Sequence, residues 1–151
     1  MSDLIGSDRS LSSETQETLA TLVGTIIPAS TAHGVPGADD PAIFADLMAS
    51  AGSVLEFLEE AMRGFAACAP TFSSASEAER LAAAEAFRAA EPEAMGLILS
   101  LISQAYYRDP RVLEALGTPA RPPFPEGYEV PAGDWSLLDP VKARGPIWRE
   151  T

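Results

Sequence analysis

Apolar residues recur along most of the chain at the three- and four-residue spacing of a helix face. The first helix is predicted to begin at Ser13, because Ser13 and Gln16 have the spacing of a capping box. It ends before Pro28, since proline interrupts helical hydrogen bonding. Its apolar stripe is formed by Leu19, Leu22, Val23, Ile26 and Ile27.

Two further helices are indicated by an aspartate followed by proline, a pair typical of the first turn. Asp40-Pro41 precedes an apolar stripe at Ile43, Phe44, Leu47 and Met48. Asp109-Pro110 precedes a shorter apolar stretch that ends at Gly117, where glycine favours helix termination.

The middle of the chain predicts three more helices. One runs from about Val54 to Pro70, and a second opens at a Ser76/Glu79 capping box and is alanine-rich, as expected of a surface helix. The third starts at Pro92 and is apolar on nearly every face up to Tyr106, so we expect it at the centre of the fold.

The regular pattern stops at Thr118, and seven of the 13 prolines and both tryptophans follow it. The fold is therefore predicted to be all-α, a small bundle of about five to six helices with an extended C-terminal arm rich in proline and aromatic residues. The expected divisions are a flexible N-terminus (1–12), a helical domain (13–117) and the arm (118–151).

The formal net charge of −12 argues against nucleic acid or an anionic membrane surface as a partner. Apolar runs fall short of the roughly 20 residues that span a bilayer. The first 14 residues lack the pattern of an export signal, so a cytoplasmic location is expected. The alternative is a periplasmic location, which would apply if a partner chain carried an export leader or if a leader had been removed from this chain.

Candidate catalytic groups are few. Gly34 and Gly37 do not open a helix after a strand, so a phosphate-binding loop is not indicated and this chain is not expected to bind flavin or nicotinamide. Two neighbouring carboxylate pairs occur, Asp39-Asp40 and Glu59-Glu60. They are interpreted as a helix cap and a solvated helix face, so no catalytic residue is assigned.

His33 and Cys68 are each the only residue of their type. His33 with Asp39 and Asp40 could form a weak metal site, although a polar loop residue beside a helix cap is the simpler interpretation, and no metal site is assigned. Cys68, in the apolar sequence FAACAP, is predicted to be a small buried side chain. The alternatives are a reactive or intermolecular thiol, and a nucleophilic pair with His33 that no local sequence feature supports.

Large apolar residues in the arm cannot form a core of their own. We expect the arm to cross the central helix and carry Trp135 and Trp148 to a partner chain. The alternative is an arm that only covers the helices of its own domain. Of the Tyr106-Tyr107 pair, one ring should face the core and the other should face outward. The predicted interface consists of Tyr107, Phe124, Tyr128, Trp135 and Trp148.

Three segments resemble the gluconate 2-dehydrogenase subunit 3 family: TLVGTIIPAS, VPGADD leading into PAIFADLM, and QAYYRDPRVLEALGTPARPPFPEGY. The similarity runs from about Leu19 to Tyr128. It implies a helical accessory chain without a cofactor, bound to an FAD-bearing large subunit of the glucose-methanol-choline oxidoreductase group. That subunit would oxidise an alcohol of a sugar, sugar acid, polyol or glycoside.

Two features of the family are not found in this sequence. Many members begin with a twin-arginine leader, which the first residues here do not show. Membrane-bound members work with a multihaem cytochrome subunit, and because no CxxCH occurs here, such a subunit would be separate.

The predicted function is thus a non-catalytic small subunit that stabilises a flavoprotein dehydrogenase. The alternatives are a stand-alone helical adaptor, a ligand-binding protein, or a small enzyme that uses the His33–Asp40 loop.

Overall fold

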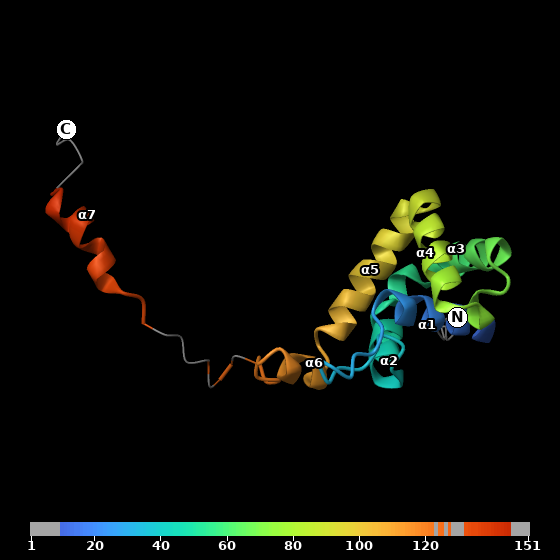
Figure 1. Cartoon of the computed structure of the whole chain (residues 1–151), viewed down its shortest axis with the longest axis horizontal. Coiled ribbons are helices and arrows are strands. Elements are labelled where there is room, and N and C mark those ends of the chain that lie inside the picture. Colours follow the sequence, from blue (N-terminus) through green and yellow to red (C-terminus); the bar gives the residue numbers. More distant parts are fainter. Residues whose placement is uncertain (1–9, 123, 126, 128–131, 146–151) are drawn as a thin grey trace, which may run out of the picture. The chain divides into compact units, whose positions relative to one another are not determined.

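The computed structural model describes residues 10–122, 124–125, 127 and 132–145. The chain divides into two units, Met1–Ala120 and Arg121–Thr151, which are considered separately (Figure 1). The predicted all-α class is confirmed: the described residues form helices, and the sole strand-like pairing among them is an isolated bridge between Ser30 and Val35. The helices of the first unit are α1 (Ser13–Ile26), α2 (Pro41–Ser50), α3 (Leu55–Cys68), α4 (Glu77–Ala90), α5 (Pro92–Tyr106) and α6 (Pro110–Ala115).

α1 begins at Ser13 as predicted, and the predicted helix caps are correct except at α1. Asp40, Ser76 and Asp109 each cap the helix that follows, and Ser76 forms the expected reciprocal capping box with Glu79. At α1 the cap is Ser12, whose hydroxyl accepts from the Thr15 amide at 3.2 Å. The Ser13/Gln16 capping box was therefore wrong by one residue, because two adjacent serines offer the same chemistry.

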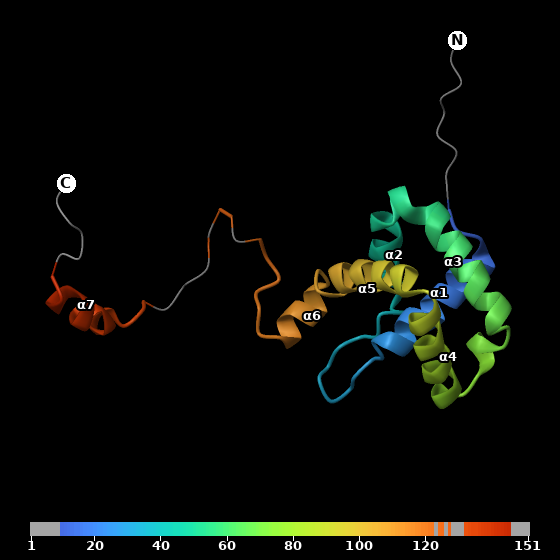
Figure 2. The ribbon, with the colours of Figure 1, turned by 90° about the horizontal axis from the view of Figure 1, so that it is seen from above.

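The core of the first unit lies where α1 and α5 meet the other helices. α1 packs on α3 and α4, and α5 packs on α2, α3 and α4 (Figure 2). A cluster of three rings extends the core, with Phe65 4.8 Å from Phe72 and 4.9 Å from Phe87 between ring centroids. The fully buried side chains include Leu19, Leu22, Ile43, Leu47, Leu58, Met62, Ile98 and Ile102.

The predicted characters of α4 and α5 are largely confirmed. α4 buries Ala84 and Phe87 while Leu81 remains exposed, as expected of a surface helix. α5 contributes seven buried residues, yet Leu99 is 37% exposed. One face of the central helix is thus open, although its sequence is apolar on nearly all sides.

The second unit contains a helical segment that the sequence did not predict. The 3-10 helix η3 (Trp135–Leu138) leads into α7 (Asp139–Ala143). Asp134 caps it by accepting from the Ser136 amide at 2.9 Å. The arm is therefore not extended throughout, and its course across the central helix stays a prediction.

Among the described residues, no single helix is long and apolar enough to cross a membrane. Pro41–Ser50 and Gly52–Cys68 together meet the length and composition that a span requires, but the pair is bent by 69°.

Candidate functional site

Ion pairs centred on Arg111 join the loop before α2 to the turn before α6. The Arg111 guanidinium donates to both carboxylate oxygens of Asp40, over Nη1–Oδ2 and Nη2–Oδ1 distances of 3.0 and 2.7 Å. It also donates to both oxygens of Asp109, at 3.0 and 2.9 Å. Because Asp40 and Asp109 cap α2 and α6, one arginine ties together the first turns of two helices.

The charges in this network reinforce one another. Hydrogen bonds from Arg111 lower the pKa of Asp40 from 3.8 to about 2, against an opposing effect of burial and with help from the Ala42 amide. Hydrogen bonds from Arg111 likewise lower the pKa of Asp109, and the two carboxylates raise the pKa of Arg111. All three groups are therefore ionised near neutral pH, which suits a structural role better than proton transfer.

Of the two tyrosines at the end of α5, one ring is buried and the other is exposed, as predicted. Tyr106 is buried and its hydroxyl donates to the Pro36 carbonyl at 3.1 Å, which fixes the loop before α2. Burial raises the pKa of Tyr106, with smaller contributions from Tyr107 and Asp109. Tyr107 packs edge-to-face on Tyr106 with 5.6 Å between ring centroids, and remains 56% exposed.

Arg108 adds a second connection between α2 and the end of α5. Its guanidinium donates to Asp46 at 2.8 and 3.0 Å and to the Ser50 hydroxyl at 2.8 Å. The segments VPGADD and QAYYRDPR, about 70 residues apart, therefore form one continuous contact region, visible where the loop runs beside α6 (Figure 1).

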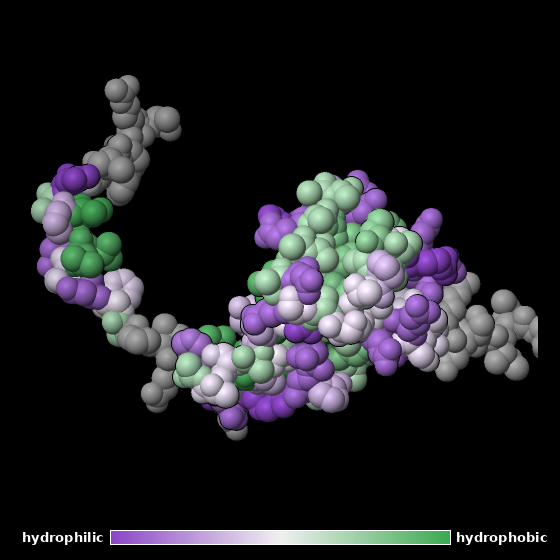
Figure 3. Space-filling view, turned by 45° about the vertical axis from the view of Figure 1, so that its right-hand side comes forward, coloured by the Kyte–Doolittle hydropathy of each residue, from purple (hydrophilic) through white to green (hydrophobic). Residues whose placement is uncertain are grey.

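The predicted interface residues that the structure describes are all exposed. Tyr107 is 56%, Phe124 83% and Trp135 72% exposed. Tyr128 and Trp148 lie outside the described residues. In the second unit, the short helical segment exposes four large apolar side chains, those of Trp135, Leu137, Leu138 and Val141. Figure 3 shows green, hydrophobic atoms on the surface of this segment.

The loop that holds His33 does not assemble a metal site from described residues. His33 is exposed, and Asp40 is engaged by Arg111 and by the Ala42 amide. The Asp39 side chain lies against Gly24, where a Cβ atom would come within 2.7 Å of its Cγ atom. Within the described ranges, no three His, Cys, Asp or Glu side chains are grouped as metal ligands. The interpretation of Asp40 as a helix cap is confirmed.

Cys68 contradicts the sequence prediction. It is exposed, not buried, at the end of α3. Cys68 is exposed because of the tertiary structure: it borders an open groove of about 720 Å³ between α3 and α4. Of the apolar residues around it, Phe65 is buried in the core, whereas Cys68 and Ala69 line the groove.

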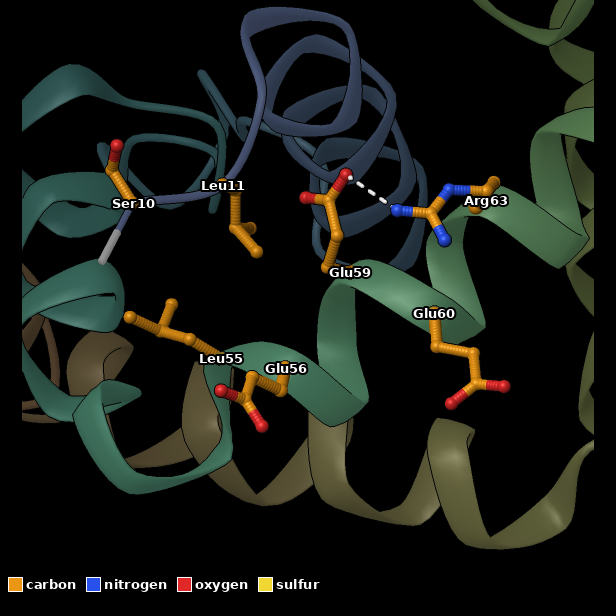
Figure 4. A pocket seen from close by; sticks show the side chains of 7 residues that line it. All are labelled: Ser10, Leu11, Leu55, Glu56, Glu59, Glu60 and Arg63. Carbon is orange, nitrogen blue, oxygen red and sulfur yellow. Dashed lines mark hydrogen bonds and ion pairs between the residues drawn. The ribbon is translucent and has the colours of Figure 1, made fainter. Parts of the chain in front are cut away.

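A second depression, of about 420 Å³, is acidic (Figure 4). Glu59 is its most connected residue: it accepts from the Ser12 amide at 3.1 Å and the Thr15 hydroxyl at 3.0 Å, and pairs with Arg63 at 3.4 Å. Although burial opposes the shift, these contacts lower the pKa of Glu59. Figure 4 shows the Glu56 and Glu60 side chains pointing away from that of Glu59. Glu59 therefore binds the start of α1 to α3, and the three carboxylates of the depression do not converge on one point.

Two residues with a central role were misjudged from the sequence. Glu59 was interpreted as part of a solvated face but fastens α1 to α3. Arg111 was not singled out, although an arginine directly after Asp109-Pro110 can reach its own cap residue. Its second partner, Asp40, could not be inferred from local spacing.

No protein-family model, no curated protein and no solved structure matches the chain.

Proposed function

We propose that this chain is the non-catalytic small subunit of a heteromeric FAD-dependent alcohol or sugar oxidoreductase. In this proposal it binds and stabilises a flavoprotein large subunit of the glucose-methanol-choline type, as its resemblance to the gluconate 2-dehydrogenase subunit 3 family implies. FAD and the catalytic residues belong to the large subunit. A cytochrome subunit that accepts the electrons would be a further, separate chain.

One observation carries the proposal: large apolar side chains are exposed along the C-terminal third of the chain. Tyr107 and Leu116 are 56% and 61% exposed in the first unit, and Phe124 and Trp135 are 83% and 72% exposed in the second. Aromatic side chains of this kind provide much of the binding energy in protein interfaces. Their exposure therefore supports a role in binding another protein.

The proposed effect on the partner follows from mass action. A chain that binds only the folded large subunit increases the stability of that subunit, and it covers apolar surface that would otherwise promote aggregation. The Tyr106–Pro36 hydrogen bond and the Arg111–Asp40 ion pair support this role because they fix the loop before α2 beside the exposed Tyr107 ring.

Co-expression with an FAD-binding oxidoreductase of the glucose-methanol-choline type from the same genome tests the proposal. The chain alone should be colourless and inactive, the large subunit alone should be poorly soluble, and the two together should co-purify with flavin. A large subunit that is fully soluble and active without this chain would contradict the proposal.

The alternatives differ in what they require. An adaptor would present the same exposed residues, so the identity of the co-purifying protein separates it from a dehydrogenase subunit. An enzyme or ligand-binding protein based on the His33–Asp40 loop has less support, because Asp40 is already held by Arg111. A metal-induced thermal shift that disappears in His33→Ala would favour it.

A further inference from the structure

We infer that the groove between α3 and α4 is a second docking surface, which accepts an amphipathic helix of the large subunit. The helix would place bulky apolar side chains in the groove and Lys or Arg side chains at its rim. The inference rests on the proposed function, and it adds a binding site that does not involve the C-terminal arm.

The groove has an aromatic base and walls of small residues. Phe65 and Phe87 are buried and 4.9 Å apart between ring centroids, and both line the groove. The walls come from Ala61, Gly64 and Cys68 on α3 and from Ala83, Ala86 and Ala90 on α4. Small side chains let the backbone of an incoming helix approach closely, and its larger side chains can then reach the aromatic rings.

Its dimensions suit a helical segment. The lining residues of α3 extend from Phe57 to Cys68, about three turns or roughly 16 Å. α1 and α5 each pack on both α3 and α4, so the walls are held apart in the free chain. Phe57, 44% exposed, offers an aromatic contact at one end. The groove is thus a preformed open site for a helix of three turns or more.

The charge of the rim specifies the occupant further. Apart from the Cys68 thiol, the ionisable groups that line the groove are the carboxylates of Glu60 and Glu91, both on exposed residues. Within the described part of the chain neither carboxylate forms an ion pair or hydrogen bond. Cationic side chains on the incoming helix would complement them, and the net charge of −12 would favour the same encounter.

Cys68 provides a direct test, because it is the only cysteine and lines the groove. The rate of Cys68 alkylation by N-ethylmaleimide is measured in the free chain and in the purified complex. We expect alkylation to be at least about tenfold slower in the complex, since a bound helix excludes the reagent. If the complex forms but the rate is unchanged, the groove inference fails while the proposed function stands. If no complex forms, both fail.

Matched variants separate groove occupancy from indirect effects. Ala86 and Ala89 are both exposed on α4, but only Ala86 is among the groove-lining residues. Ala86→Trp should weaken the complex by about tenfold or more, and Ala89→Trp by less than about twofold. Equal affinities of the two variants would overturn the inference.

The rim charges have a similar control. Glu60→Lys should weaken the complex more than Glu17→Lys, which changes the net charge equally on α1. Equal effects would contradict the proposed cationic partner helix. The alkylation rate of Cys68 also distinguishes a small amphiphile from a partner helix. If dodecyltrimethylammonium slows alkylation and the large subunit does not, the groove binds a small amphiphile, and the inference is overturned.

Discussion

Arg111, near the start of α6, pairs with Asp40 at the start of α2, 71 residues away in the sequence. Its planar guanidinium can satisfy two carboxylates at once, which a lysine ammonium cannot do with the same geometry. Asp40 in turn has two functions, since it caps α2 through the Ala42 amide and pairs with Arg111. Substitutions at Asp40 can separate these two contributions.

Asp40→Ala should lower the free energy of unfolding by about 1–2 kcal/mol, because it removes the helix cap together with the ion pair. Asp40→Asn should cost clearly less, since asparagine caps helices nearly as well as aspartate. Urea denaturation at neutral pH measures both. Equal losses in the two variants would show that the cap contributes nothing.

The ion pair also predicts a pH dependence. The pKa of Asp40 is about 2 in the folded protein against 3.8 ordinarily, so the folded state favours the ionised form. Its contribution to stability is present above about pH 4 and is lost as the pH falls toward 2. The stability difference between the wild type and Asp40→Asn should therefore shrink from pH 5 to pH 2. A difference that is constant over this range would contradict the assignment.

The helix caps could be predicted from the sequence residue by residue, because their hydrogen bonds are local. Asp40, Ser76 and Asp109 were recognised as caps because each cap bonds to an amide two or three residues away. Cys68 was predicted wrongly because its exposure depends on how far α4 lies from α3. The Arg111–Asp40 pair likewise depends on tertiary structure.

At the scale of elements, α5 shows how far an apolar pattern determines burial. Ile98 and Leu99 are neighbours of equal side-chain size, yet Ile98 is 1% and Leu99 37% exposed. The sequence predicted a helix that is apolar on nearly all sides, and it could not tell which face the packing of α2, α3 and α4 would leave uncovered.

Alanine substitutions at Ile98 and Leu99 should differ in their effect on stability, as the burial of the two side chains differs. Ile98→Ala is expected to cost about 2–5 kcal/mol, because it leaves a cavity among α5 and its neighbours. Leu99→Ala should cost less than about 1.5 kcal/mol, since its side chain is already partly in water. Thermal or urea unfolding provides the comparison, and similar losses would mean that the uncovered face of α5 is misassigned.

The helical segment in the arm had a signal that was overlooked. Asp139-Pro140 is a third aspartate-proline pair, like those that begin α2 and α6, and Pro140 lies in the first turn of α7. Its effect was masked by the prolines nearby and by the absence of a long apolar stripe. Short helices of this kind lack the periodicity on which sequence interpretation depends.

At the scale of the whole molecule, the division into two units suggests separate functions. The first unit has a continuous core that includes α1 and α5, whereas the described large apolar residues of the second unit are exposed. We therefore expect the first unit to determine folding and the second to contribute much of the partner binding. A substitution in the arm should then affect assembly alone.

Trp135→Ala should weaken the complex with the large subunit by about 2 kcal/mol, or roughly 30-fold, if Trp135 is an interface anchor. Lys142→Ala, which removes another exposed side chain of the same segment, serves as the control and should change affinity little. Neither variant should alter unfolding of the first unit. Unchanged affinity of Trp135→Ala would remove Trp135 from the interface.

The most direct test of the proposed function is sedimentation velocity, followed by flavin absorbance, of the FAD-binding large subunit co-expressed with this chain. The flavin signal should sediment as one species whose mass is the sum of the two chains. A flavin signal that sediments at the mass of the large subunit alone, with this chain in a separate slower species, would contradict the proposed function.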